Sequence, residues 1–170
     1  FQLIGYRLSS DLGFFIGRTI GPIFKSKKII IQNIKKANIK HSDNLSQIAS
    51  NVLGNYGRIF AEYVYLKKFR NDELKKYVSI DGLEHLENLK NNNKKAVFIS
   101  GHFNNFELMA MEIEKAGIDL AAIYRPLNNI FLNKTMEQIR KENICKNQIK
   151  KGRAGSREII KNLTEGKSIA

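Results

Sequence analysis

The sequence predicts an α/β fold in which a central, mostly parallel sheet is flanked by helices and preceded by a helical, membrane-associating region. The first observation behind this prediction is a change in the sequence pattern at Tyr77, after which short apolar runs alternate with segments of helical periodicity. Such alternation is typical of parallel sheets with right-handed crossovers. The second observation is the apolar and then strongly basic composition of residues 1–40. We therefore predict a membrane-associating helical segment at 1–40 and an α/β domain at 41–170.

Residues 1–24 are apolar and glycine-rich, and the charges of Arg7, Asp11 and Arg18 interrupt them. No uncharged run reaches the roughly 20 residues that a membrane-spanning helix needs. We expect this segment to lie in a membrane surface with its apolar side chains inserted and its cations in water; an ordinary packed helix is the alternative. Residues 25–40 carry six lysines and no acid, which predicts a basic amphipathic helix that binds a membrane or exposes its lysines to solvent.

A long helix is expected after this segment, with Ser42 or Asp43 as its N-cap. Apolar residues then recur every three or four positions, at Leu45, Ile48, Val52, Tyr56, Ile59, Tyr63 and Leu66. Gly54 and Gly57 interrupt this pattern, and glycine at such positions indicates close packing against a neighbouring helix. Glu62 lies in the same helix, where it is either a structural residue or a contributor to a site.

The remaining residues provide the strands and helices of the α/β domain. The strand candidates are short apolar runs at 77–80, 96–100 and 120–124. The helix candidates are 83–90, a segment from about Asn105 to Ala116 that Gly117 ends, a segment from about Asn129, and a segment from Ser156 to Gly166. Asn104 or Asn105 is the expected N-cap of the second of these helices.

The charge of the chain points to an anionic partner. Its 170 residues include 29 basic and 16 acidic side chains, which give a formal net charge of +13. Such an excess suits phospholipid headgroups, an acidic protein or nucleic acid. Cys145 is the single cysteine, which excludes an internal disulfide, and no cysteine–histidine cluster indicates structural zinc. The sequence starts at Phe1 and stops within an apolar run at Ala170, so we expect the natural protein to continue beyond both ends.

The strongest chemical signal is the segment 100–107, Ser-Gly-His-Phe-Asn-Asn-Phe-Glu. His102 and Glu107 are five positions apart, which on an ideal helix is a rotation of about 500°, so they would not share a face. They can meet if His102 lies in the loop after a strand and Glu107 in the first turn of the next helix. The carboxylate would then fix the imidazole tautomer, and the other ring nitrogen could take a proton from a substrate hydroxyl. A metal site is disfavoured because a third ligand is lacking.

Further candidates depend on the same strand-to-helix geometry. Arg125 directly follows the strand candidate 120–124, so parallel strands would place it at the sheet edge that holds His102. Its guanidinium suits a phosphate or the charge of a reacting carbonyl, and a surface ion pair is the alternative. Asn105 is expected at a helix N-terminus, whose N–H groups suit an oxyanion or a phosphate of the substrate. The alternative is that Asn105 serves only as the cap of that helix. A basic cluster consists of Lys150, Lys151, Arg153 and Arg157. It could bind an acidic carrier protein or a phosphorylated lipid, or it could be a solvated face.

The segment Gly101–Glu107 resembles the His-x4-Glu block of the bacterial lipid A late acyltransferases, the lauroyl/myristoyl acyltransferase family. The segment Tyr124–Asn129, Tyr-Arg-Pro-Leu-Asn-Asn, resembles the second block of that family, and the order and spacing of the two blocks agree. The resemblance implies an O-acyltransferase of lipopolysaccharide biosynthesis in which His102 is the general base and Glu107 orients it. The residues that would bind substrate are Arg125, Asn105, Lys151 and Arg153.

The resemblance also implies the partners of the enzyme. The donor would be an acyl carrier protein thioester, and the acceptor a hydroxyl of a phosphorylated lipid A precursor at the cytoplasmic face of a bacterial inner membrane. No metal or other cofactor and no nucleic acid is implied. Two alternatives stay open: acylation of another membrane glycolipid or phospholipid, and a non-catalytic basic protein that binds membrane or RNA. The end of the acyl-chain pocket is expected at Phe103, Phe106 or Met109.

Overall fold

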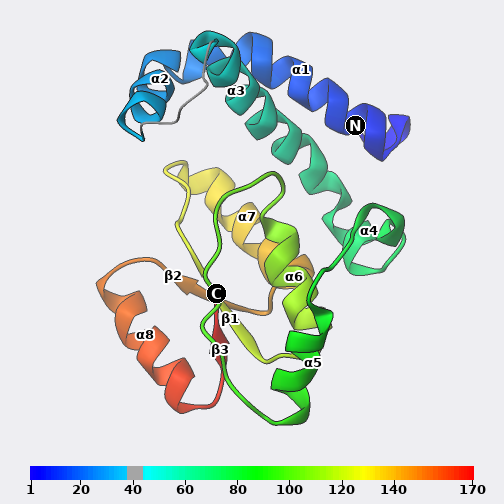
Figure 1. Cartoon of the computed structure of the whole chain (residues 1–170), viewed down its shortest axis with the longest axis vertical. Coiled ribbons are helices and arrows are strands. Elements are labelled where there is room, and N and C mark those ends of the chain that lie inside the picture. The colour runs from blue at the N-terminus through cyan, green and yellow to red at the C-terminus, as the bar shows by residue number, and fades with distance from the viewer. Residues whose placement is uncertain (38–43) are drawn as a thin grey trace. The chain divides into compact units, whose positions relative to one another are not determined.

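The computed structural model describes residues 1–37 and 44–170. The chain divides into two compact units, an N-terminal unit of Phe1–Tyr65 and a C-terminal unit of Leu66–Ala170, and each is described by itself (Figure 1). The predicted boundary between residues 40 and 41 lies outside the described residues and stays a prediction.

The N-terminal unit is helical, as the sequence predicts. Its elements are η1 (Gln2–Ile4), α1 (Tyr6–Phe24), α2 (Lys27–Lys36), α3 (Leu45–Glu62) and η2 (Tyr63–Tyr65). Asn44 is the N-cap of α3, because its Oδ1 accepts a hydrogen bond of 3.0 Å from the backbone N–H of Gln47. The predicted caps Ser42 and Asp43 lie outside the described residues. Within the described parts of the chain, no helix is both long enough and apolar enough to cross a bilayer.

Helices α1 and α3 lie side by side along a seam of small residues (Figure 1). A Cβ atom on Gly57 would overlap with the backbone carbonyl oxygen of Gly13 and with the backbone of Gly17. A Cβ on Gly54 would likewise overlap with the ring of Phe14. The close packing that Gly54 and Gly57 predict is therefore confirmed.

Because the seam consists of small residues, α1 turns most of its larger apolar side chains away from α3, and Phe14, which packs on Gly54, is an exception. The residues of α1 that are buried are Ser9, Ser10 and Gly13. The large apolar side chains of α1 that remain exposed are Leu8, Leu12, Phe15, Ile16, Ile20, Ile23 and Phe24. The buried carboxylate of Glu62 accepts hydrogen bonds from Ser10 Oγ at 2.6 Å and Tyr6 Oη at 3.2 Å, so it joins the end of α3 to α1.

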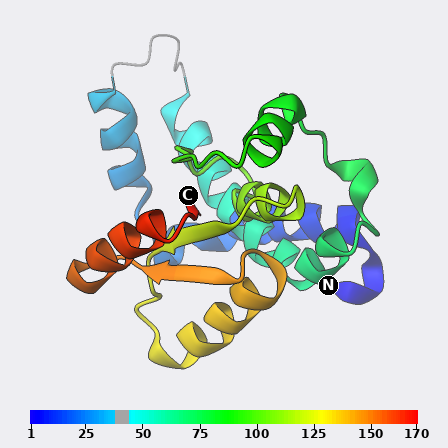
Figure 2. The same cartoon turned by 90° about the horizontal axis from the view of Figure 1, so that it is seen from below.

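The C-terminal unit contains a three-stranded parallel sheet with helices on both faces, which confirms the predicted fold class in its coarse form. Its elements are α4 (Leu66–Arg70), η3 (Lys75–Tyr77), α5 (Leu83–Asn91), α6 (Glu107–Lys115), β1 (Leu120–Tyr124), α7 (Ile130–Asn143), β2 (Asn147–Lys150), α8 (Arg153–Thr164) and β3 (Ser168–Ile169). The strand order is β2-β1-β3, with Ile123 opposite Ile149 and Ala121 opposite Ile169. Figure 2 shows the same elements along a perpendicular view.

The two faces of the sheet have different helices, because successive side chains of a strand point to opposite sides. On one face, Ala121, Ile149 and Ile169 form a buried cluster against Ile159 and Leu163 of α8. On the other face, the ring of Tyr124 packs under the guanidinium of Arg140 from α7, with 5.6 Å between the guanidinium carbon and the ring centroid. Helices α6 and α7 therefore cover the face opposite α8.

Two of the predicted strands differ from the structure. The predicted strand 77–80 is wrong: Tyr77 ends the short helix η3 and residues 78–80 have no strand partner among the described residues. The predicted strand 96–100 is reduced to a single parallel bridge between Val97 and Ile169. Conversely, β2 was not predicted, because its sequence Asn-Gln-Ile-Lys has little apolar character.

The helix ends confirm some predicted caps and correct others. Asn129 caps α7 through Oδ1, which accepts from the backbone N–H of Phe131 at 3.0 Å. Asn104 or Asn105 as cap of α6 is wrong, because the helix begins at Glu107 after Phe106, without a side-chain cap. Helix α8 begins at Arg153, three residues before the predicted cap Ser156, because the chain turns at Gly152. Gly117 and Gly166 end their helices with positive φ, as predicted.

Candidate active site

The main pocket of the C-terminal unit lies at the carboxyl ends of the parallel strands, where ligands of open α/β sheets bind. Its volume is about 590 Å³. The walls come from the loop before α6, from α6 and α7, and from the residues that follow β1 and β2. The predicted site residues that line it are His102, Glu107, Arg125 and Lys151. Two predicted site residues do not line it, Asn105 and Arg153.

His102 lies in the loop between the bridge at Val97 and helix α6, as predicted. Its imidazole is exposed and packs against the ring of Phe106, with 4.3 Å between the ring centroids and 52° between the ring planes. In the described part of the chain no hydrogen-bond partner holds the imidazole, so both ring nitrogens remain available to a substrate.

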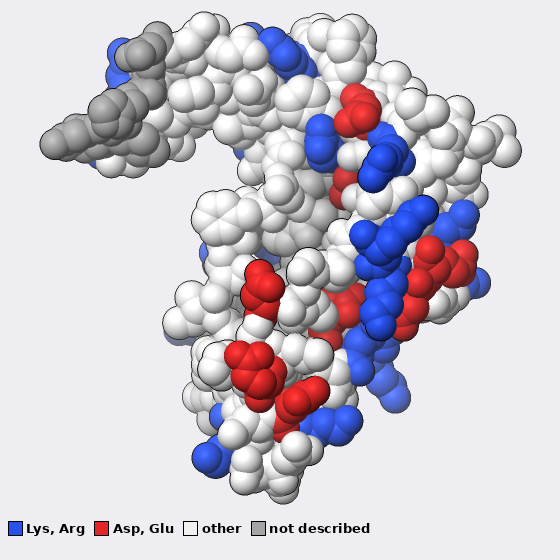
Figure 3. All heavy atoms as spheres, turned by 45° about the vertical axis from the view of Figure 1, so that its right-hand side comes forward, with Lys and Arg blue, Asp and Glu red and all other residues white. Residues whose placement is uncertain are grey.

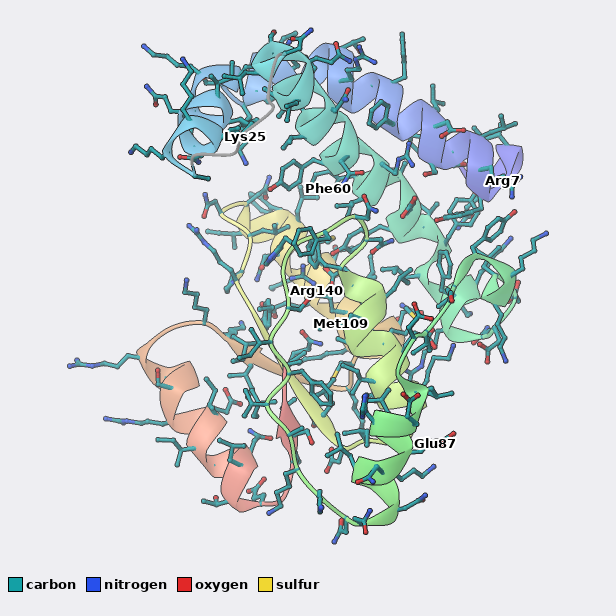
Figure 4. All side chains as sticks on the ribbon, viewed as in Figure 1. Arg7, Lys25, Phe60, Glu87, Met109 and Arg140 are labelled. Carbon is teal, nitrogen blue, oxygen red and sulfur yellow. The ribbon has the colours of Figure 1, made fainter. Side chains whose placement is uncertain are left out.

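Glu107 is the first residue of α6 and is buried. Its Oε1 accepts two hydrogen bonds from Arg140 of α7, from Nη2 at 2.6 Å and from Nε at 3.0 Å. Both side chains are about nine-tenths removed from water, so the pair is a buried, charge-assisted contact. Figure 4 labels Arg140 on α7 beside the start of α6. The structure thus brings His102 and Glu107 to one pocket. The predicted hydrogen bond between them is absent among the described residues, because the carboxylate accepts from Arg140 and the imidazole packs on Phe106.

A second polar cluster supports this wall of the pocket. The carboxylate of Glu137 accepts hydrogen bonds from Tyr124, from Lys150 Nζ at 3.0 Å and from Asn133 Nδ2 at 2.6 Å. These donors, Tyr124 first, lower the pKa of Glu137 from 4.5 to about 2. Burial, followed by the bond to Glu137, raises the pKa of Tyr124, so its phenol stays protonated at neutral pH. Tyr124 is thereby fixed between β1 and α7, beneath Arg140.

The cations at the mouth of the pocket are less constrained. Arg125 follows β1 and is exposed, and within residues 1–37 and 44–170 it has no ion-pair partner, which counts against a surface ion pair. The backbone N–H of Lys151 donates to the carbonyl of Tyr124 at 2.8 Å, and Lys151 is one of the residues that line the pocket. The predicted basic cluster therefore divides, because Lys150 pairs with Glu137 and Arg153 begins α8 away from the pocket.

Comparison with known families decides the class of the protein. The family model described as bacterial lipid A biosynthesis acyltransferase matches residues 1–170, the whole chain. The chain belongs to this family. It is therefore an acyltransferase enzyme of lipid A biosynthesis. No protein of curated function and no solved structure matches the chain significantly.

Of the three residues expected at the end of the acyl-chain pocket of this lipid A acyltransferase, two line the pocket described above. Phe106 and Met109 line it, whereas Phe103 does not and is 81% exposed. No cluster of three or more His, Cys, Asp or Glu side chains that could hold a metal ion occurs among the residues that the structure describes.

The sequence did not predict Arg140 as the partner of Glu107. A signal for it exists, because it is four residues after Met136 and continues the apolar face of α7. A basic residue in that position of an amphipathic helix indicates a buried anionic partner. The anion that Arg140 meets depends on the packing of α7 against α6. Its partner, Glu107, is 33 residues away in the chain.

Proposed function

We propose that this enzyme transfers a fatty acyl group from an acyl carrier protein thioester to a hydroxyl of a lipid A precursor. The observation that carries the proposal is the pocket that combines the exposed imidazole of His102 with the buried Glu107–Arg140 pair. This combination supplies a base and a fixed charge but needs no protein nucleophile, so direct attack of the hydroxyl on the thioester is sufficient.

In the proposed reaction, His102 takes the proton of the acceptor hydroxyl while the oxygen forms a bond to the thioester carbonyl carbon. The tetrahedral intermediate then breaks its carbon–sulfur bond, and the imidazolium returns the proton to the leaving thiolate. Glu107 stabilises the imidazolium, and catalytic hydrogen bonds of this kind commonly tighten only when substrate binds. Arg140 holds the buried carboxylate in place through two charge-assisted hydrogen bonds.

Arg125 and Lys151 are proposed to bind the anionic parts of the substrates. Both line the mouth of the pocket, where a phosphate of the acceptor or the acidic surface of a carrier protein would approach. The net charge of +13 favours both partners and predicts association that weakens as salt rises. The pocket does not distinguish a lipid A precursor from another phosphorylated glycolipid; the family favours the former.

The proposed location is the cytoplasmic face of a bacterial inner membrane. Two features of the N-terminal unit support binding to the membrane surface: the exposed large apolar side chains of α1, and the cations of Arg7, Arg18 and the lysine-rich helix α2. A helix with such a face lies in the headgroup region while its cations meet anionic lipids.

The test of the proposal is acyl transfer by the purified protein, from an acyl carrier protein thioester to a lipid A precursor. His102→Ala should lower turnover by about 10²- to 10⁴-fold, the usual loss when a general base is removed. Glu107→Gln should also lower turnover, because the amide cannot stabilise the imidazolium. The matched control is His85→Ala, which removes an exposed histidine of α5 and should leave turnover unchanged. Wild-type turnover by the His102→Ala variant would contradict the mechanism.

A further inference from the structure

The carboxylate of Glu137 joins three elements around the loop that carries Arg125. Its Oε1 accepts from Lys150 Nζ of β2 at 3.0 Å and from Asn133 Nδ2 of α7 at 2.6 Å. Tyr124 of β1 donates to the same carboxylate. Glu137 does not line the active-site pocket, and its side chain is only 17% exposed. It therefore lies behind the wall of the pocket and not where a substrate binds.

The loop between β1 and α7 is held at both ends and in its middle. Tyr124 at its start belongs to β1, and Asn129 at its end caps α7. In the middle, the backbone N–H of Leu127 donates to Asn133 Oδ1 at 2.9 Å. The amide of Asn133 thus accepts from the loop and donates to Glu137. Because an ionised carboxylate can only accept, it fixes which end of this amide faces the loop.

Arg125 has little backbone freedom in this loop. It directly precedes Pro126, and a residue before proline is restricted to extended backbone. Hydrogen bonds link both residues that flank this dipeptide to Glu137: Tyr124 directly, and Leu127 through an amide. The side chain of Arg125 is exposed and lines the pocket. A backbone that is fixed in advance lowers the ordering cost of binding a ligand.

We propose, on the basis of the function proposed above, that Glu137 is a positioning residue for Arg125, which binds a phosphate of the acceptor. Glu137 acts through Asn133 and Tyr124, which hold the loop. A guanidinium matches two phosphate oxygens with a planar pair of donors, so its fit depends on the orientation of the backbone that carries it. Loss of Glu137 therefore weakens binding of the acceptor without removing the guanidinium.

The test combines hydrogen exchange with steady-state kinetics of the full enzyme. Glu137→Met and Asn133→Ala should each accelerate exchange of the Leu127 amide, because its acceptor is freed or lost. Both should raise KM for a phosphorylated lipid A precursor by about tenfold, the scale of a hydrogen bond to a charged group, with little change in kcat. Glu137→Gln keeps an oxygen that accepts from Asn133, so both measurements should lie closer to wild-type values than in Glu137→Met.

The matched control is Glu142→Met on the same helix. Glu142 is exposed, and its Oε1 accepts from Gln138 Nε2 at 2.8 Å, four residues earlier, as Glu137 accepts from Asn133. Among the described residues, neither Gln138 nor Glu142 bonds to the loop 125–128 through its side chain. Exchange of the Leu127 amide and KM for the acceptor should therefore stay at wild-type values in this control.

A double variant separates positioning from general support of the fold. In the Arg125→Ala background, Glu137→Met should not raise KM for the acceptor further, because the guanidinium that it positions is already absent. Additive effects, an unchanged Leu127 amide in a folded Glu137→Met variant, or a rise in KM for the acyl donor alone would each overturn the proposal. Wild-type protein that transfers no acyl group would count against the proposed function instead, while the Leu127 amide would still report whether Glu137 holds the loop.

Discussion

Helix α1 of the N-terminal unit and the sheet of the C-terminal unit use their apolar side chains in opposite ways. In the C-terminal unit, Met111, Leu120 and Ile149 are fully buried around the sheet. In the N-terminal unit, α1 buries serine and glycine against α3, and Phe15 of the same helix is 63% exposed. On the face that Figure 3 shows, charged side chains are correspondingly dense over the C-terminal unit and sparse over the N-terminal unit.

This difference follows from what each helix packs against. A helix that meets its neighbour through glycine brings the two backbones close, as small-residue seams do in membranes, and its large side chains must then point away. A helix that covers a sheet fills the space between them with large side chains. Exposed apolar side chains in a continuous stripe indicate an interaction surface, and on α1 the partner we propose for it is the membrane. The following predictions test this contrast.

The largest effect is expected at the buried ion pair of the C-terminal unit. Arg140→Met removes the cation that holds Glu107 and should destabilise this unit by roughly 3–5 kcal/mol, because the carboxylate stays buried. Activity should fall as well. Adding Glu107→Gln should recover part of the stability but none of the activity. Denaturant unfolding and acyl-transfer assays measure the two effects, with exposed Lys141→Met as the control. An unchanged unfolding midpoint for Arg140→Met would show that the pair contributes little.

The glycine seam should be the sensitive point of the N-terminal unit. Gly57→Ala would favour α3 by about 1 kcal/mol if helix propensity alone acted. The overlap of the new Cβ with the backbone of Gly13 should instead cost about 1–3 kcal/mol. Hydrogen exchange of α1 and α3 amides should therefore accelerate, while amides of the C-terminal unit keep their rates. Asn51→Ala, at an exposed position of α3, should slow or preserve exchange. Slower hydrogen exchange in Gly57→Ala would contradict the close packing of α1 and α3 at this glycine.

The exposed face of α1 should matter for membrane binding and little for stability. Phe15→Ser should change the free energy of unfolding by no more than about 0.5 kcal/mol, because the ring is mostly exposed. It should lower partition onto anionic phospholipid vesicles by about 10- to 100-fold, since burial of a phenylalanine contributes about 1.5–3 kcal/mol. Flotation of the vesicles measures partition. The variant Asn51→Glu, which changes the charge of the N-terminal unit but no apolar side chain, measures how much charge alone affects partition. Full binding by Phe15→Ser would remove this face from the proposed membrane surface.

A further effect is a dependence of stability on pH in the C-terminal unit. Because the folded pKa of Glu137 is lowered from 4.5 to about 2, its ionised form stabilises the folded state above pH 4.5. This contribution is lost as the pH falls from 4.5 to about 2. The stability difference between the wild-type protein and Glu137→Gln should therefore shrink across that interval. Thermal unfolding at a series of pH values measures it, and a difference that stays constant down to pH 2 would contradict the assignment.

The sequence by itself determined the parts of this protein that depend on neighbouring residues. The apolar run 120–124 forms β1, Asn129 caps α7, and Gly117 and Gly166 end their helices, because each of these features requires only local backbone geometry. The order of strand, loop and helix also placed His102, Glu107 and Arg125 at one sheet edge, since parallel strands share their carboxyl ends.

The tertiary structure alone decided the parts that depend on distant partners. The run 77–80 has strand composition, but no strand of the described residues lies beside it, whereas the polar segment 147–150 forms β2 because β1 offers it hydrogen bonds. Glu107 meets Arg140 only because α6 and α7 cover the same face of the sheet. Strand pairing and buried ion pairs join residues far apart in the chain, so composition and periodicity within one segment cannot specify them.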